Sequence, residues 1–156
     1  MASDVDRAPE EGASRRAQRW LRSFIPWGKG AAAELTVGQE LEALRHEGYV
    51  VMHDFMLGNE RNVDHVVAGP NGVFMIETTF SDHDEVHLAK AKRQARKLHD
   101  EIGCWVTPVI CSSERTFVRE GVLVAERGRL ADAIRAQPRR RPVESDRLAR
   151  FADFLD

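Results

Sequence analysis

The stretch that most restricts the fold is residues 62–80, NVDHVVAGPNGVFMIETTF. Two runs rich in strand-forming residues flank the sequence Pro-Asn-Gly, which is typical of a turn, so the stretch predicts a β-hairpin. A two-residue turn at positions 70–71 pairs Gly69 with Gly72. Side chains alternate between the two faces of a strand, and one face of this hairpin is apolar throughout. That face, which is the expected core side, carries Val63, Val67, Phe74 and Ile76.

The other face of the hairpin carries two carboxylates. Counting outward from the turn in antiparallel register, Val66 opposes Met75 and Asp64 opposes Glu77. Thr79 falls on the same face, one step further along. A glycine bulge at the turn would shift this register by one residue and separate the acids.

Two acids that face each other need a physical reason. Like charges directly opposite one another destabilise a strand pair, and each carboxylate raises the proton affinity of the other. A divalent cation removes this cost, and Mg²⁺ is commonly held by one or two carboxylates with water and phosphate oxygens. The residues alone leave two interpretations open, a solvated acidic pair and a divalent metal site at Asp64 and Glu77.

The rest of the chain predicts an α/β fold, a mixed β-sheet flanked by helices in the order α-β-β-β-α-β. A first helix with Thr36 and Gln39 as a capping box is expected to end at Gly48. A second long helix is expected from about Ser81 to Ile102. The strands are expected at 49–57, 62–69, 73–79, 104–111 and 121–125, and a short helix at 129–137.

Composition favours a soluble protein with a single folded domain. The chain has 156 residues, 42% of them apolar and 31% charged, with a net charge of −2. That charge gives no general attraction for nucleic acid or membrane, so such a partner would need a local patch. No apolar run approaches the ~20 residues that cross a bilayer. The two cysteines, Cys104 and Cys111, lie in an apolar run and are expected to be reduced core residues of a cytoplasmic protein.

Three parts are expected along the chain: a tail or appended helix at 1–30, the domain at 31–137, and a linker with an amphipathic C-terminal helix at 138–156. The first part is unusual, because residues 14–30 interleave basic and aromatic side chains at helical spacing. Such a segment can lie on a membrane surface or dock on a protein partner. The alternative is that its aromatic side chains cap the core.

Several motifs together resemble one known family, the nuclease-related domain (NERD) family. They are Glu40 in VGQE, the segments VMHDF and NVDHVVAGPNGVFMIET, and Gln94 in AKRQA, and the likeness runs from about residue 33 to 125. The family is placed in the PD-(D/E)XK, or restriction-endonuclease-like, nuclease superfamily. The resemblance implies a restriction-endonuclease-like core and cleavage of phosphodiester bonds in DNA or RNA, assisted by Mg²⁺ or Mn²⁺.

The resemblance also implies roles for individual residues. Asp64 and Glu77 would hold the metal, Glu40 stands at the acid of the first helix, and Gln94 stands at the glutamine of the second. Thr79 stands where the family pattern has lysine, which is thought to orient water and to stabilise charge on the phosphate. Loss of one preorganised electrostatic group typically slows a reaction by a factor on the order of 10²–10³.

The second helix carries a dense basic run, KAKRQARK. Lys90, Arg93 and Lys97 are expected along one face near Gln94, as a surface that contacts phosphates. One of these cations is a candidate to reach inward and replace the missing charge. The alternative is a basic helix face that is simply solvated.

Two histidines lie next to the expected site. His65 follows Asp64 and is expected on the opposite face of its strand, where it packs or forms hydrogen bonds. His53 is a candidate for the edge of the site.

Three functions therefore compete. The favoured hypothesis is a catalytically degenerate nuclease domain that binds nucleic acid or a protein partner. The second is an active Mg²⁺-dependent nuclease that tolerates Thr79. The third is a structural or regulatory protein targeted to a membrane or partner by residues 14–30.

Overall fold

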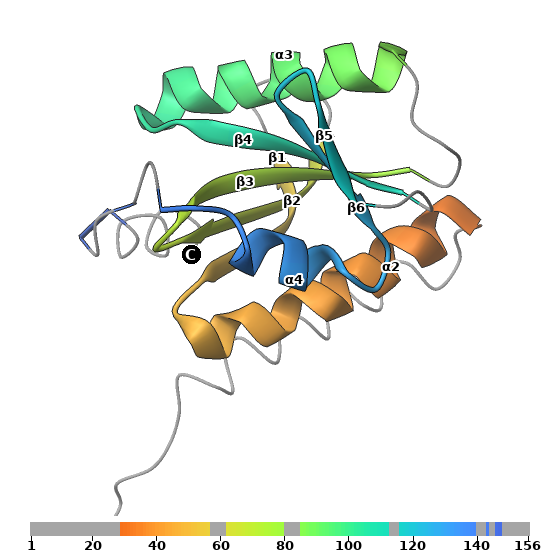
Figure 1. Ribbon diagram of the computed structural model, residues 1–156, viewed down its shortest axis with the longest axis horizontal. Helices are drawn as coiled ribbons and strands as arrows, with labels where there is room; N and C mark the ends of the chain where they lie inside the picture. Colours follow the sequence, from red (N-terminus) through yellow and green to blue (C-terminus); the bar gives the residue numbers. More distant parts are fainter. Residues whose placement is uncertain are drawn as a thin grey trace, which may run out of the picture.

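The computed structural model describes residues 29–56, 62–79, 85–112, 116–139, 143 and 146–147 (Figure 1). The basic and aromatic segment at 14–28 lies outside these residues. The first four positions of the expected second helix, 81–84, and most of the expected C-terminal helix do so as well. The predictions made for those segments therefore stay predictions.

The centre of the fold is a mixed sheet of six strands in the order β1-β2-β3-β4-β6-β5. Strands β1, β2 and β3 pair antiparallel, β3-β4 and β4-β6 pair parallel, and β5 pairs antiparallel with β6. The strands span Val50–Met56 (β1), Asn62–Gly69 (β2), Gly72–Thr78 (β3), Val106–Ser112 (β4), Phe117–Arg119 (β5) and Val122–Glu126 (β6).

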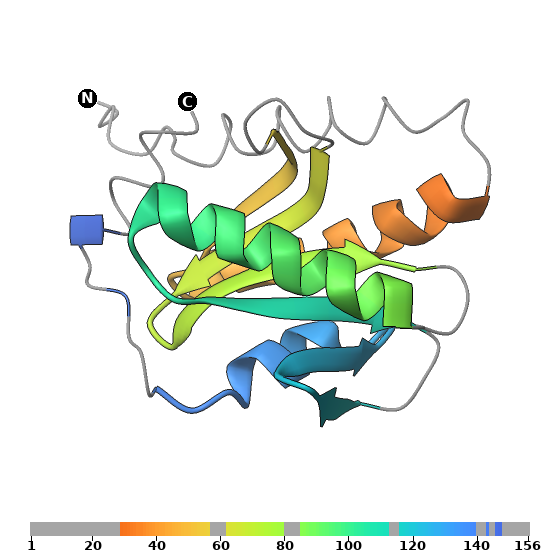
Figure 2. The same ribbon diagram turned by 90° about the horizontal axis from the view of Figure 1, so that it is seen from above.

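Helices cover both faces of this sheet. Helix α3 (Glu85–Ile102) lies across one face, and α2 (Lys29–Glu42) and α4 (Leu130–Arg135) lie on the other (Figures 1 and 2). A short 3₁₀ helix, η1 (Ala43–Glu47), continues α2. Each face has its own apolar core, one between α2, α4 and the sheet and the other beneath α3. The mixed sheet flanked by helices confirms the predicted fold class.

The hairpin register is confirmed at the turn. Gly69 pairs with Gly72 and Val66 with Met75, so no bulge shifts the two strands. Gly69 is required here, because a Cβ atom at this position would lie 2.1 Å from Cδ1 of Tyr49. The Tyr49 hydroxyl donates to Oδ1 of Asn71 at 3.0 Å, which ties the turn to the chain ahead of β1.

Asn71 also fixes the turn to the end of α4, which is far away in the sequence. Its side-chain amide donates to the backbone carbonyls of Ile134 at 2.7 Å and Gln137 at 3.2 Å, at the end of α4. The hairpin that carries the two acids is thus held at its turn by contacts far apart in sequence.

The first helix differs from its prediction at its start. Helix α2 begins at Lys29, so Thr36 lies within the helix and does not cap it. The capping-box interpretation was wrong because the alanines at 31–33 are strong helix formers and extend the helix toward the N-terminus. The α-helix ends at Glu42, six residues before the predicted stop, and it is the 3₁₀ helix η1 that ends at Gly48, which adopts a left-handed conformation with φ of 85°.

Two smaller differences concern the second half of the chain. The three-residue strand β5 was not predicted, because so short a run shows no clear alternation. Both cysteines are free, with Cys111 buried and Cys104 only half-buried.

Among the residues that the structure describes, no helix is long and apolar enough to cross a membrane.

Candidate functional site

Asp64 and Glu77 lie near each other on the α3 face of the sheet. The last paired position of the hairpin ladder is His65 with Ile76, so the two acids follow one residue beyond it. The backbone N–H of Thr78 donates to Oδ2 of Asp64 at 2.8 Å. Glu77 is only 5% exposed. The hairpin therefore brings the two carboxylates together, as its sequence predicts, and it places Glu77 in a largely dry environment.

The surroundings of the acid pair disfavour the ionised form of Asp64. The pKa of this carboxyl is raised to about 6, chiefly by burial and in addition by the nearby charges of Glu77 and Asp54. The Thr78 N–H and the charge of Lys90 act in the opposite direction but do not compensate. Asp64 is therefore held in a place where its negative charge is poorly stabilised by the protein itself.

Asp54 is a third acid near the site, and it is not among the site residues expected from the sequence. It stands in β1 between two residues that pair with β2, His53 and Phe55, but is itself left out of the ladder. Its φ of 54° is uncommon for a residue other than glycine. The signal was available in the sequence, because antiparallel alignment of β1 on β2 sets Asp54 opposite Asp64.

A cation from α3 reaches the acids. The ammonium of Lys90 forms an ion pair with Oε1 of Glu77, while a third of the Lys90 side chain stays exposed to solvent. Lys90 lies in the second turn of α3, and this helix packs mainly on β4 and also contacts β3, the strand that carries Glu77 (Figure 2). Among the three cations that the sequence nominated, Lys90 is the one with this contact to Glu77.

Gln94 lies one turn further along the same flank of α3. It is 4% exposed, and its Oε1 atom has no hydrogen-bond partner among the described residues. A buried amide oxygen without a partner costs on the order of 1–3 kcal/mol unless a water or ligand satisfies it. Gln94 thus presents an unused acceptor beneath the helix that carries Lys90.

The residue at the family's lysine position is also buried. Thr79 is 6% exposed, and its backbone N–H donates to the carbonyl of Cys111 at 2.9 Å. Its side chain brings no positive charge to the acids. The positive charge beside Glu77 comes from the helix instead of from the strand.

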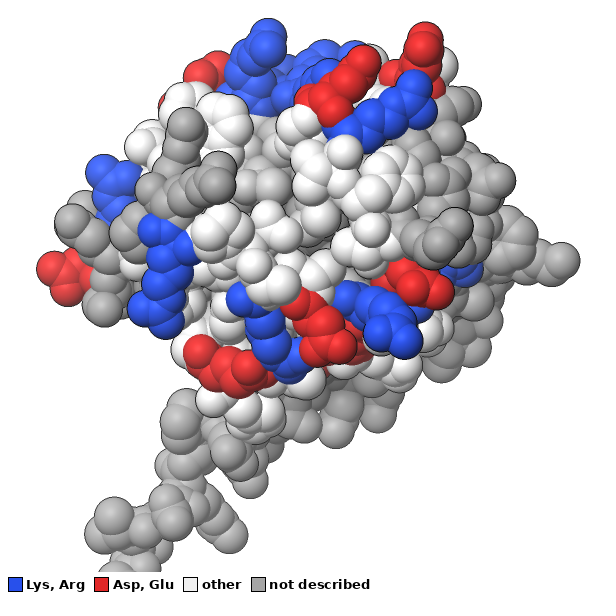
Figure 3. All heavy atoms as spheres, in the orientation of Figure 1, with Lys and Arg blue, Asp and Glu red and all other residues white. Residues whose placement is uncertain are grey.

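The remaining nominated cations stay on the surface of α3. Arg93 is exposed and Lys97 half-buried, and basic side chains gather over α3 with acidic ones among them (Figure 3). Across the described residues, no cluster of three or more His, Cys, Asp or Glu side chains could hold a metal ion by itself. A cation here would depend on the two acids, water and substrate oxygens.

The structure does not bring Glu40 to Asp64 and Glu77. Glu40 extends from α2, which covers the opposite face of the sheet, and its carboxylate accepts two backbone hydrogen bonds. The donors are the N–H of Gly128 at 3.1 Å and that of Ala131 at 3.0 Å. These contacts satisfy N–H groups at the start of α4, as a capping side chain does.

A second group of polar side chains, partly or fully buried, lies on the α2 face. Oε1 of Glu42 is 2.5 Å from Nε2 of His53, and Nδ1 of His53 is 2.8 Å from Nδ1 of His65. One of the two facing nitrogens must therefore carry the proton that the other accepts. Arg45 binds the same carboxylate at 2.6 Å.

The two histidines follow the prediction in part. His65 is fully buried on the face opposite Asp64, as predicted. His53 hydrogen-bonds to His65 and Glu42 instead of joining the acid pair. We call Glu42, His53 and His65 the acid–histidine chain.

The chain is similar to known proteins at two levels, a family model and a solved structure. The family model described as "Nuclease-related domain" matches residues 29–113. Among solved structures, the chain is similar to a repair endonuclease from Pyrococcus abyssi, with 15% identity and a TM-score of 0.49. The match covers 64% of this chain and 47% of that one, so the chain spans about half the length of that protein. No curated protein sequence matches it.

Proposed function

The chain belongs to the nuclease-related domain family, and from this premise we propose that it cleaves phosphodiester bonds in DNA or RNA with the help of a divalent cation. Mg²⁺ or Mn²⁺ is the expected cation. The observation that carries the proposal is the meeting of Asp64, Glu77 and Lys90 at the end of the hairpin. Two acids and one cation from separate elements are the groups that metal-assisted phosphodiester cleavage needs.

The two carboxylates fit a hard divalent cation. Carboxylate oxygens are its preferred protein ligands, and Mg²⁺ keeps several waters and binds substrate phosphates when only one or two acids are present. The raised pKa of Asp64 means that its negative charge lacks a full partner in the protein. When bound, such a cation acts as a Lewis acid on a phosphate oxygen. Binding should strengthen as pH rises through about 6, because Asp64 must lose its proton first.

Lys90 is proposed to take over the role of the missing strand lysine. Its ammonium is oriented by Glu77, and its partial exposure leaves it accessible to a substrate phosphate. A positive charge preorganised there stabilises the negative charge that builds on the phosphate during cleavage. The position differs from the family pattern, but the chemistry requires the charge and not the strand from which it comes.

Gln94 is proposed to position a water. Its unpaired Oε1 atom can accept a hydrogen bond from water entering the site beside Lys90. Arg93 and Lys97, on the same helix, are proposed to contact phosphates of the bound strand without taking part in the reaction. Phosphate contacts of this kind position nucleic acid without reading its sequence.

A second candidate function follows from the same ion pair. Lys90 neutralises Glu77, one of the two proposed metal ligands, and no strand lysine replaces it at Thr79. If the ammonium takes the place of a metal, the domain is degenerate and binds nucleic acid or a protein partner without cleaving. This is the hypothesis that the sequence favours.

Cleavage of supercoiled plasmid and of single-stranded DNA with Mg²⁺ or Mn²⁺ tests the proposal. We expect the wild-type chain to cleave and Asp64→Ala to be inactive. Asp100→Ala, which changes an exposed aspartate on α3, is the control for the loss of a carboxylate and should stay active.

Equal inactivity of the wild type and Asp64→Ala would contradict cleavage of these substrates. Binding of DNA that weakens steeply with salt, without cleavage, would then favour the second candidate.

A further inference from the structure

A pocket of about 360 Å³ lies on the flank of α3 that faces away from Asp64 and Glu77. It is bounded by α3, the start of β4 and the turn between β5 and β6, which rises beside the helix (Figure 1). Residues two positions apart on a helix point about 200° apart, so Lys92 and Lys90 lie on opposite flanks. The pocket is therefore separate from the candidate active site.

One wall of the pocket is an exposed aromatic ring. Trp105 is 52% exposed, although large aromatic side chains are usually buried to a high degree. The ring of His99 stands beside it, with centroids 6.4 Å apart and planes inclined by 59°. Ala95, Val106 and Pro108 complete an apolar lining. The indole thus offers a surface to a flat ligand that the fold leaves partly uncovered.

The opposite wall is basic. Lys92 and Arg96 lie one turn apart on α3 and both line the pocket. Lys92 pairs with Glu120 at 3.0 Å, and both side chains are well exposed. Such an exposed pair contributes little stability, so an anionic ligand can compete for Lys92. Glu120 itself would repel an anion, which restricts the phosphate to the side of Arg96.

We propose that this pocket binds an unpaired nucleotide of a single-stranded nucleic acid. The base stacks on Trp105, and the adjoining phosphate contacts Arg96 and Lys92. Aromatic stacking next to a basic groove is the usual means of holding single strands, since every base has a flat face and every linkage a charge. The class of ligand rests on the proposed function, whereas the pocket itself does not.

The crest of α3 connects the pocket with the candidate active site. Arg93 and Arg96 are exposed between the two flanks, and the helix rises about 9 Å from Lys90 to Arg96. A strand crossing α3 would meet this basic crest between its stacked base and the acids. The pocket would then select single-stranded substrate, because bases paired in a duplex are not free to stack on Trp105.

Binding of a fluorescein-labelled oligothymidylate of about 12 nucleotides, measured by anisotropy in EDTA, tests the pocket without any cleavage. We expect Trp105→Ala to weaken binding roughly 5- to 100-fold, the range for loss of one stacked base, and Trp105→Phe to keep most of it. Val118→Ala, which removes another exposed apolar side chain, is the matched control and should bind like the wild type.

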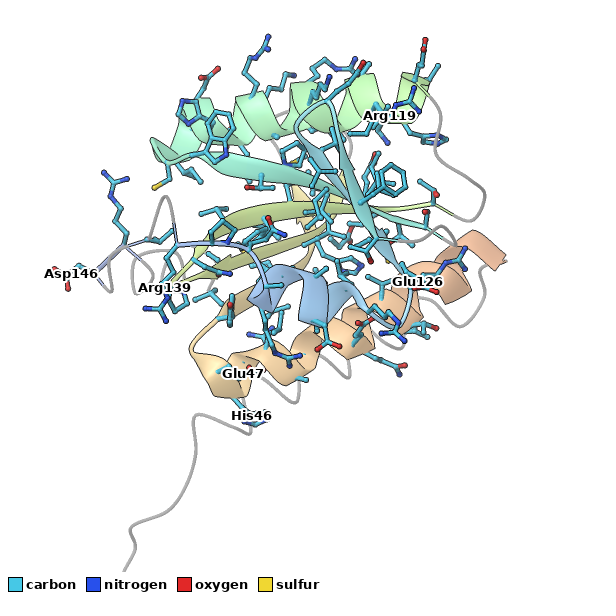
Figure 4. All side chains as sticks on the ribbon, in the orientation of Figure 1. His46, Glu47, Arg119, Glu126, Arg139 and Asp146 are labelled. Atoms are coloured by element: carbon cyan, nitrogen blue, oxygen red, sulfur yellow. The ribbon has the colours of Figure 1, made fainter. Side chains whose placement is uncertain are left out.

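The charge of the pocket is tested by the salt dependence of the same binding. We expect Lys92→Gln with Arg96→Gln to reduce the slope of log affinity against log salt by about 1.4, for two single-strand phosphate contacts. Arg129→Gln with Arg139→Gln removes the same charge elsewhere and should leave the slope nearly unchanged. Figure 4 labels Arg139 and Glu126, the partner of Arg129, at the level of α4 and away from α3.

Unchanged binding by Trp105→Ala, in a chain whose thermal unfolding matches the wild type, would overturn the proposal. Equal affinity of the wild type for the oligonucleotide and its duplex would overturn the single-strand preference. The two proposals fail separately. If Asp64→Ala abolishes cleavage while Trp105→Ala binds normally, only the pocket fails, and if nothing cleaves but Trp105→Ala loses binding, only the nuclease fails.

Discussion

Each face of the sheet carries an acid beside a cation or a histidine, and the surroundings of these two acids shift their pKa values in opposite directions. On the α2 face, burial by itself raises the pKa of Glu42, but hydrogen bonds from His53 and Arg45 outweigh it and lower the pKa to about 2. On the α3 face, the partners of Asp64 do not outweigh burial, and its pKa rises to about 6.

We infer from this difference that Glu42 is a structural acid, whereas Asp64 is the proposed functional one. Glu42 is satisfied by neighbours that belong to the fold, so its charge stabilises the native state. Asp64 is charged at neutral pH only at a cost, and it sits beside a second acid and a strained Asp54. Strain and poorly compensated charge concentrate at sites where a ligand completes the arrangement. We therefore propose that the α3 face carries the functional site and that the α2 face supports the fold.

The comparison is tested most strongly by Asp64→Asn, which keeps an acceptor for the Thr78 N–H and removes the charge. The pKa of Asp64 in the folded state exceeds its unfolded value of 3.8. The carboxyl therefore does not destabilise the fold well below pH 3.8, and it destabilises the fold increasingly as pH rises from there to about 6. We expect the free energy of unfolding of the variant to exceed that of the wild type by about 2–3 kcal/mol at pH 7.5, without divalent cations. Urea unfolding at several pH values measures this difference.

The difference in stability between Asp64→Asn and the wild type should nearly vanish below about pH 3, where the wild-type carboxyl is largely protonated in both states. Asp100→Asn is the matched control and should show no such pH-dependent gain. A variant less stable than the wild type at pH 7.5 would mean that Asp64 is a structural acid like Glu42.

Glu42→Gln should change the free energy of unfolding in the opposite direction, making the protein less stable. The folded pKa of Glu42 lies below its unfolded value, so its contribution is present above pH 4.5 and is lost as pH falls toward 2. We expect the variant to lose about 1–2 kcal/mol at pH 7, after allowance for solvent screening of a carboxylate that is one-quarter exposed. Glu101→Gln, an exposed change on α3, provides the control for the same unfolding measurement.

A loss that persists undiminished at pH 2 would contradict this account of Glu42, because protonation should by then have removed the charge from the wild type. Cleavage, in contrast, should be unaffected by Glu42→Gln at temperatures where the variant stays folded.

Glu40→Gln should have a smaller effect on stability, and it distinguishes a structural role of Glu40 from a catalytic one. Its contacts predict that Glu40→Gln costs about 1 kcal/mol of stability, as loss of a helix cap does, and leaves the cleavage rate unchanged. Its place in the family pattern predicts the reverse. Thermal unfolding and a cleavage assay on the same variant decide between them, and loss of cleavage at full stability would return Glu40 to the catalytic set.

The hairpin was predictable because its determinants are local. The turn residues, the alternation and the strand lengths fix a register in which Gly69 meets Gly72, and that register carries Asp64 and Glu77 with it. The depth of burial that raises the pKa of Asp64 was not predictable, because it depends on how α3 and β1 cover the site.

Contacts between elements far apart in the chain could not be predicted from the sequence. The basic run of α3 nominated Lys90 among several cations, but only the placement of the helix over the sheet selects it for Glu77. Glu40 borders an apolar stripe, which marks a half-buried acid without saying what it binds. Its partners, Gly128 and Ala131, are backbone groups that carry no signal in the sequence.

The most direct test of the central claim is the rate of DNA cleavage by Lys90→Met, compared with Arg129→Met at saturating substrate. Both changes remove one cation, but Arg129 stands at the start of α4, on the other face of the sheet, and pairs with Glu126 instead of Glu77. If Lys90 supplies the catalytic charge, its loss should slow cleavage by a factor on the order of 10²–10³, and Arg129→Met should cleave at the wild-type rate. Wild-type cleavage by Lys90→Met would contradict the claim.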